Sequence, residues 1–189
     1  MVLPFADGII ADAESGLSLI RPSVEYLDSY VEACAETWDN IHSRYILHDP
    51  ALADSWRKTI FDTFENQYRG LELPEGWFPV AVLWAVRNDE FVGAVNIRLQ
   101  MDDALIRYGG TYGYFVRTSA RGCGYGTAIA KLGLEATRCL GVNPIVITCQ
   151  ESNTPSMAAS EHLPYLRKER DIVDVDGTVQ PVWRYWFTE

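Results

Sequence analysis

A glycine-rich run at residues 121–126, Arg-Gly-Cys-Gly-Tyr-Gly, is the feature that most constrains what this chain can fold into. It lies between a predicted strand at residues 112–116 and a predicted helix at residues 127–140. Amides at a helix N-terminus bind anions, and glycines permit positive φ and close approach of a ligand to the backbone. The run therefore predicts a diphosphate site, where Arg121 adds a positive charge and Thr127 a hydroxyl donor.

Two other nucleotide-binding loops do not fit this run. A dinucleotide fingerprint, Gly-x-Gly-x-x-Gly, would need glycine at position 127 or 129, where the chain has Thr127 and Ile129. A Walker loop ends in Gly-Lys-Ser or Gly-Lys-Thr, and the sequence contains neither triplet. A purely structural turn stays open as an alternative, because glycine-rich turns begin many helices. We favour phosphate binding, because a strand and Arg121 precede a glycine at every second position.

The composition is that of an ordinary soluble domain, and we expect one domain over residues 1–189. The formal net charge of −10 argues against a nucleic-acid-binding protein, which needs a basic surface. We see neither a signal-peptide pattern nor the run of about 20 apolar residues that a membrane span requires, so we expect a cytoplasmic protein. The cysteines lack metal-site spacing, so we expect no metal.

The other predicted elements follow a mixed order. Strands are expected at residues 17–20, 80–86, 91–99, 112–116 and 145–149, and in a C-terminal hairpin that turns at Asp176-Gly177. Helices are expected at residues 24–38, after Asp49-Pro50, and at residues 127–140 and 153–163. After Asp49-Pro50, one apolar stripe is expected along a single helix, formed by Leu52, Trp56, Ile60 and Phe64. This order predicts an α/β fold of the α+β kind, a mixed and largely antiparallel sheet flanked by helices.

The loop and its surroundings resemble the GNAT superfamily of N-acetyltransferases. Residues 121–126 match the family signature Arg/Gln-x-x-Gly-x-Gly/Ala, and residues 113–119 resemble the fourth strand that leads into it. Residues 147–149 and Asn153-Thr154-Pro155-Ser156 resemble the fifth strand and the Asn-x-x-Ser start of the next helix. Residues 91–98, with Asp102 and Gly109-Gly110, are similar to a bacterial subgroup of uncharacterised predicted acetyltransferases.

The resemblance implies a GNAT-like fold with a splayed cleft for acetyl-CoA between strands 4 and 5. A bulge in the fourth strand would support that splay. The implied cofactor-binding residues are the backbone of Phe115, Val116 and Arg117 beside the pantetheine amides, and Asn153 and Ser156 along the pantetheine arm. The pyrophosphate would be held by the loop residues Arg121, Gly122, Cys123, Gly124, Tyr125, Gly126 and Thr127.

The implied reaction is direct attack of a primary amine on the thioester, which moves an acetyl or short acyl group from acyl-CoA. The amine must first lose a proton, and Tyr114 and Asp102 are the candidate bases. Many family members carry a tyrosine seven residues after the Asn as general acid, whereas this chain has Ser160 there. This departure keeps open an alternative function, a catalytically weak or inactive CoA-binding sensor or regulatory protein.

The implied partners are acetyl-CoA and an amine acceptor, without nucleic acid or membrane. A homodimer is also expected from the C-terminal strand at residues 182–187. Its alternating Trp183, Tyr185 and Phe187 would let this strand pair with a second copy across a sheet edge.

Overall fold

A computed structural model describes residues 10–38, 47–175 and 177–188. Its helices and strands follow the mixed order predicted from the sequence, in two antiparallel sheets with helices around them. In chain order they are β1 (Ile10–Asp12), β2 (Leu17–Ile20), α1 (Leu27–Thr37), α2 (Ala53–Trp56), α3 (Ile60–Arg69), β3 (Val80–Arg87), β4 (Glu90–Arg98), the π-helix η5 (Leu105–Gly109), β5 (Tyr112–Val116), α4 (Tyr125–Cys139), β6 (Val146–Gln150), α5 (Thr154–Glu161), β7 (Arg167–Val175) and β8 (Thr178–Trp186). The predicted α+β class is confirmed.

The larger sheet has the strand order β1-β2-β3-β4-β5, with every neighbour antiparallel. The β3–β4 hairpin turns at Asn88 and Asp89, whose φ angles of 49° and 63° are those of a tight hairpin turn. The bulge expected in the strand before the glycine loop, β5, is not there, because β4 and β5 pair in unbroken register. Instead the register shifts in the β3–β4 pairing, where Val92 is the extra residue.

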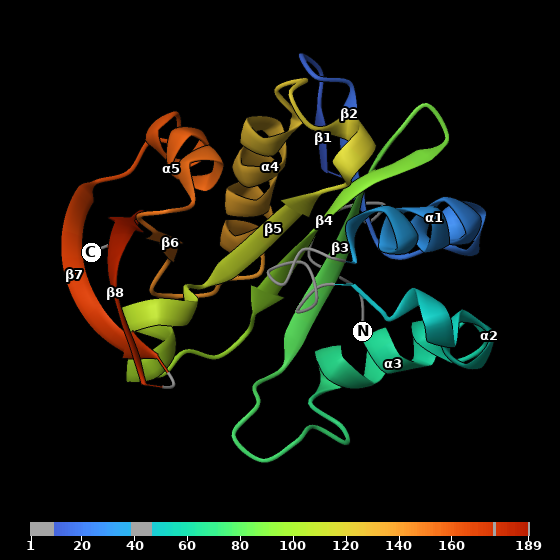
Figure 1. The fold of residues 1–189 in the computed structure, drawn as a ribbon, viewed down its shortest axis with the longest axis horizontal. Helices are drawn as coiled ribbons and strands as arrows, with labels where there is room; N and C mark the ends of the chain where they lie inside the picture. Colours follow the sequence, from blue (N-terminus) through green and yellow to red (C-terminus); the bar gives the residue numbers. More distant parts are fainter. Residues whose placement is uncertain (1–9, 39–46, 176, 189) are drawn as a thin grey trace.

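Helices cover both faces of this sheet. Helix α4 packs on one face through Ile129, Leu132 and Ala136, while α1 and α3 pack on the other around Trp84 and Phe91. Gly133 lets α4 approach β5 closely, because a Cβ there would lie 2.9 Å from the Tyr112 ring. Figure 1 shows α4 between the cluster of α1, α2 and α3 and the region of α5.

The single helix expected after Asp49-Pro50 is wrong in its length and in its stripe. The chain forms a short turn and α2, and then begins again at α3. Ile60 and Phe64 are buried, but Leu52 is 57% exposed, because it belongs to the turn that precedes both helices. The spacing of four residues therefore predicted the buried face correctly only in α3, where Ile60 and Phe64 belong to one continuous helix.

The smaller sheet has the order β6-β8-β7, so β8 is its middle strand. Both backbone edges of β8 are paired, with β6 on one side and β7 on the other. The expected dimer through the edge of residues 182–187 is therefore contradicted, because that strand has no free edge. The predicted hairpin turn includes Asp176, which lies outside the described residues.

The two sheets meet at one point and then diverge. The Thr111 amide donates to Val146 O at 2.7 Å, and the Val146 amide donates to the Thr111 hydroxyl at 2.9 Å. Beyond that joint β5 pairs with β4 and β6 pairs with β8, so the C-terminal ends of β5 and β6 border an open gap. This is the predicted splay, since β5 and β6 are the strands that resemble the family's fourth and fifth strands.

Candidate functional site

The glycine loop joins β5 to α4 at the wide end of the gap. Gly122 and Gly124 have φ of 79° and 80°, the left-handed region in which other residues are strained. Gly124 is the N-cap of α4, and no side chain caps this helix end. The first amides of α4 thus point toward the gap with the positive end of the helix dipole behind them. This geometry fits an anionic group.

The end of β5 offers its backbone to the gap at Val116. The Arg117 amide donates to Val92 O at 2.9 Å, so it is already used on the β4 side. Backbone groups alternate in direction along a strand, so those of Val116 face the gap. Arg121 Nε donates to Val116 O at 3.1 Å, which lays the arginine side chain across the mouth.

The Arg117 side chain lies away from the gap, and the sequence-based prediction places only the backbone of this residue beside the cofactor. The Arg117 side chain is 8% exposed, and its guanidinium pairs with the Glu36 carboxylate and donates to Ser29 Oγ at 3.0 Å and Phe91 O at 3.1 Å. Glu36 also accepts bonds from the Ser119 amide and hydroxyl. The Arg117 hydrogen bond lowers the pKa of Glu36 and raises that of Arg117. This brace fixes the start of the loop to α1.

The opposite side of the gap is built by α5 and the end of β6. Asn153 caps α5, where its side-chain oxygen accepts from the Ser156 amide at 3.3 Å. The Cys149 thiol lies 3.2 Å from Ser156 Oγ and 3.5 Å from Ser160 Oγ. Burial raises the pKa of the Cys149 thiol, so it is a neutral group at physiological pH. This side presents small neutral side chains.

Tyr114 reaches into the gap from β5 and belongs to the same cluster. Burial raises its pKa to about 12, while weak side-chain hydrogen bonding with Ser156 and Ser160 acts in the opposite direction. Its hydroxyl oxygen is buried and makes no hydrogen bond of normal geometry within the described part of the chain. A hydroxyl with this pKa keeps its proton near neutral pH, which does not suit the predicted role of base.

Asp102 lies at the start of η5 and acts as a cap. Its carboxylate accepts from the Leu105 amide at 2.8 Å, and it does not line the gap. Ser160 is fully buried against Cys149 and does not line the gap either. The structure therefore brings Tyr114 to the site and leaves the other two candidate catalytic residues outside it.

A large cleft follows the whole gap, with a volume of about 690 Å³. Most of the predicted cofactor-binding residues line it, together with Tyr114 and His162, namely Phe115, Val116, Arg121, Gly122, Gly124, Gly126, Thr127, Asn153 and Ser156. Arg117, Cys123 and Tyr125 are not among the lining residues. Sequence reasoning missed Glu36 and Cys149, since Glu36 lies 81 residues from Arg117 and no local pattern relates the two.

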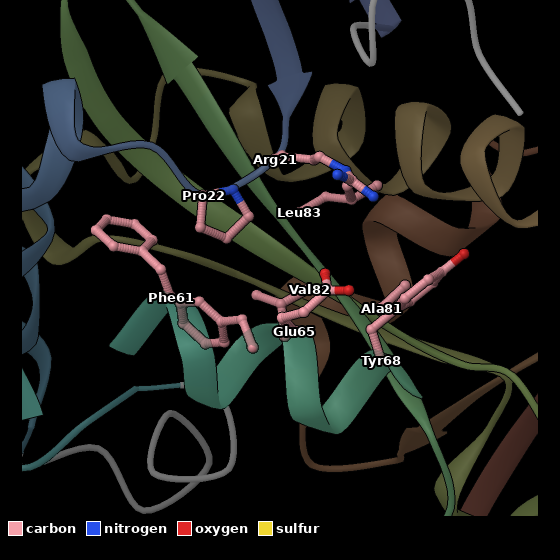
Figure 2. Close-up of a pocket in the computed structure, with 9 residues that line it drawn as sticks. Arg21, Pro22, Phe61, Glu65, Tyr68, Ala81, Val82 and Leu83 are labelled. Carbon is pink, nitrogen blue, oxygen red and sulfur yellow. The ribbon is translucent and has the colours of Figure 1, made fainter. Parts of the chain in front are cut away.

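A second cavity lies between α3 and β3 and has a volume of about 120 Å³. Figure 2 shows its labelled side chains, with Phe61, Glu65 and Tyr68 from α3 and Arg21 across from them. It has no glycine loop or helix N-terminus, and it is much smaller than the cleft. The cleft is therefore the better candidate site.

Among the described residues, no group of histidine, cysteine or acidic side chains could hold a metal ion. Within the same residues, no helix has both the length and the apolar character needed to cross a membrane.

Several solved structures share this fold at low sequence identity. RimJ of Mycobacterium smegmatis, in complex with a CoA disulfide, is 19% identical, with a TM-score of 0.66 over 92% of this chain and 83% of RimJ. RimL, a ribosomal L7/L12 alpha-N-protein acetyltransferase in complex with coenzyme A, is 16% identical, with a TM-score of 0.63 over 94% of this chain and 96% of RimL.

The microcin C7 self-immunity acetyltransferase MccE, in complex with acetyl-CoA and AMP, is 16% identical, with a TM-score of 0.58 over 92% of this chain and 93% of MccE. At these low identities, the TM-scores show a common fold. A search of curated proteins finds no match. The model of the acetyltransferase (GNAT) family matches residues 38–163, which is more than half of the sequence and includes the glycine loop and α5. The chain therefore belongs to the GNAT acetyltransferase family.

Proposed function

We propose that this protein is an N-acetyltransferase that moves an acetyl, or short acyl, group from acyl-CoA to a primary amine. The observation that carries the proposal is the cleft, which runs from the uncapped N-terminus of α4 to the Tyr114–Ser156 region between two diverging strands. A ligand with a diphosphate and a long, uncharged arm that contains amide groups has the form of this cleft. The CoA complexes of RimJ, RimL and MccE support the same choice.

In this proposal the amides of residues 122–127 hold the pyrophosphate, and Arg121 adds charge at the mouth. The backbone of Val116 pairs with a pantetheine amide as an added strand would, while Asn153 and Ser156 line the arm. We omit Arg117 from the contacts, because its amide and its side chain are already bonded. Cys123 and Tyr125 belong to the loop without lining the cleft.

The reaction is direct attack of a neutral amine on the thioester carbonyl. An alkylamine arrives protonated, since its pKa is about 10.4, and must lose that proton first. Neither Tyr114, whose pKa is raised, nor Asp102, which caps Leu105, suits the role of base. We propose that water takes the proton and that a backbone amide of β5 stabilises the oxyanion.

A thermal-shift titration with acetyl-CoA, CoA and ATP tests the cleft as a CoA site. A ligand at 100 times its Kd stabilises a fold by about 2.7 kcal/mol. We expect that shift for acetyl-CoA and CoA in the wild type, and little effect of ATP. Gly126→Glu should abolish it, because Gly126 lines the cleft and a carboxylate there would repel the pyrophosphate.

Cys139→Glu is the charge control, since it adds the same charge to an exposed residue at the C-terminal end of α4, outside the cleft lining. It should retain the shift. The absence of a shift in the folded wild type would refute the CoA site. If acetyl-CoA binds and mass spectrometry finds no acetylated product across a panel of primary amines, the sensor function replaces the transferase.

A further inference from the structure

The Tyr114 hydroxyl is a buried donor on a residue that lines the cleft. Its oxygen is buried, and it makes no hydrogen bond of normal geometry to any residue in the described ranges. A buried hydroxyl without a partner costs stability, so such groups are rare in folded proteins. Ser156 and Ser160 on α5 are its polar neighbours in the protein, and because Tyr114 lines the cleft, a bound ligand can offer its hydroxyl a better acceptor.

This hydroxyl lies close to Ser160, the position at which the chain differs from many family members. The nearest hydroxyls to Tyr114 are those of Ser156 and Ser160, one and two turns along α5. Ser160 occupies the place, seven residues after Asn153, where many family members carry a tyrosine. The phenol that α5 lacks is thus provided from the facing strand, β5, at the same end of the cleft.

We propose that the Tyr114 hydroxyl donates a hydrogen bond to the CoA sulfur as the thioester carbon–sulfur bond breaks. This inference rests on the proposed acetyl transfer and adds a catalytic residue to it. It also explains how a chain with serine on α5 retains help for its leaving group.

The step balances without transfer of the phenol proton. The amine nitrogen forms a bond to the carbonyl carbon, the carbon–sulfur bond breaks, and its electron pair stays on sulfur. A thiol has a pKa of about 8.5, which is far below that of a buried phenol, so the proton remains on Tyr114. The thiolate leaves with a hydrogen bond from Tyr114, the amide nitrogen loses its extra proton to water, and CoA is protonated after release.

The other groups that face Tyr114 are weaker donors or are already bonded. Ser156 and Ser160 contact the Cys149 thiol, which is itself neutral. His162 lies further along the cleft, where its Nδ1 is 2.7 Å from Ala158 O. No carboxylate or ammonium group acts directly on Tyr114, within the residues that the structure describes.

The test compares Tyr114→Phe with Tyr112→Phe and reads the pKa of bound CoA by the ultraviolet absorbance of its thiolate. Tyr112 is the matched control because it lies on the same face of β5, but its hydroxyl donates to Ala130 O at 2.8 Å. A hydrogen bond stabilises the thiolate, so loss of Tyr114 should raise the bound thiol pKa by about one unit, a tenfold change in ionisation. Tyr112→Phe should leave that pKa at the wild-type value.

Stability and kinetics separate this role from a structural one. Tyr114→Phe removes an unpaired buried hydroxyl, so its thermal midpoint should equal or exceed that of the wild type, whereas Tyr112→Phe should melt earlier. With any accepted amine, Tyr114→Phe should lower kcat about 10- to 100-fold and change KM for acetyl-CoA less than about threefold.

An unchanged thiol pKa in folded Tyr114→Phe that still binds CoA would overturn the proposal. Failure of the wild type to bind CoA would instead overturn the proposed function, so the two failures are distinguishable. The equilibrium measurement needs no acceptor, and it decides the matter even if no amine in the panel reacts.

Discussion

The two sides of the cleft differ in the groups that they present, which are main-chain groups on one side and side chains on the other. The side formed by β5, the glycine loop and the start of α4, which we call the loop wall, presents main-chain groups and is held from behind by Arg117 and Glu36. The side formed by the end of β6 and α5, which we call the serine wall, lines the cleft with Asn153 and Ser156, while Cys149 and Ser160 lie buried behind them.

This difference separates binding from reaction. In the proposed function, main-chain amides bind the part of CoA that is common to every acyl donor, and the positions of these amides depend on φ angles and a buried brace. The serine wall lies beside Tyr114, where the thioester would lie, so its side chains affect chemistry more than affinity. Substitutions should therefore act on the loop wall through stability and CoA binding, and on the serine wall through smaller local effects.

The largest expected effect is the loss of the brace behind the loop wall. Arg117→Met removes a guanidinium bonded to Glu36, Ser29 Oγ and Phe91 O, and leaves Phe91 O without that donor. We expect the free energy of unfolding to fall by about 2–4 kcal/mol in urea denaturation. Arg121→Met, on the exposed side of the same loop, should cost less than about 1 kcal/mol. Equal losses in the two variants would show that the brace is not what holds the loop wall.

A smaller effect, with a defined pH dependence, is expected at Glu36. Its pKa is lowered in the folded state, chiefly by the Arg117 hydrogen bond, so its contribution is present above the ordinary glutamate pKa and lost as pH falls through the folded value. Glu36→Gln should cost about 1–2 kcal/mol at pH 7, and this difference should shrink as pH falls below about 4.

Glu32→Gln is the control for that measurement, because Glu32 is 71% exposed and lies 3.8 Å from Arg117. It should change the free energy of unfolding by less than about 0.5 kcal/mol at any pH. A Glu36→Gln difference that stays constant down to acid pH would contradict the ionic contribution.

On the serine wall, Asn153 is expected to contribute about 1 kcal/mol as the cap of α5. Asn153→Ala should lose that amount in equilibrium unfolding, because the Ser156 amide loses its acceptor. Asn153→Ser restores a side-chain oxygen at the cap and should recover most of the stability. If both variants are equally unstable, the residue contributes through a contact other than the cap.

The smallest expected effect is at Ser160. Its hydroxyl lies 3.5 Å from the Cys149 thiol, a weak contact, and it does not line the cleft. Ser160→Ala should change the free energy of unfolding by less than about 1 kcal/mol and kcat by less than about threefold. A loss in kcat as large as that of Tyr114→Phe would show that the leaving-group donor lies on the serine wall. It would then contradict the different roles that we assign to the two walls.

The loop wall could be predicted in detail because its chemistry is local in sequence. Glycines at every second position between a strand and a helix determine φ angles and free amides without reference to the rest of the chain. The same local logic predicted the β3–β4 hairpin. The ion pair of Arg117 with Glu36 could not be predicted, because strand periodicity gives the side of a strand on which a residue lies and gives no information about a partner on α1.

The serine wall and the smaller sheet depend on contacts that are distant in sequence. Cys149 and Ser160 meet only after α5 folds back on β6. The aromatic alternation of residues 182–187 correctly indicated a strand, but it could not show that β7 and β6 would both pair with it. Likewise, the spacing of Leu52 and Trp56 matched that of α3, while Asp49-Pro50 began a turn that ended before α3.

The hydrogen bonds between Thr111 and Val146 lie at the closed end of the cleft, where they can act as a pivot between the two sheets. The two sheets are joined there by an amide–carbonyl hydrogen bond and an amide–hydroxyl hydrogen bond. Within each sheet, the strands are held together by their own ladders of backbone hydrogen bonds. A small rotation at such a pivot becomes a larger displacement at the glycine loop. We therefore expect donors of different acyl length to change the angle between the sheets more than the packing within either one. In amide hydrogen exchange, ligand-dependent protection should then increase from the pivot toward the mouth.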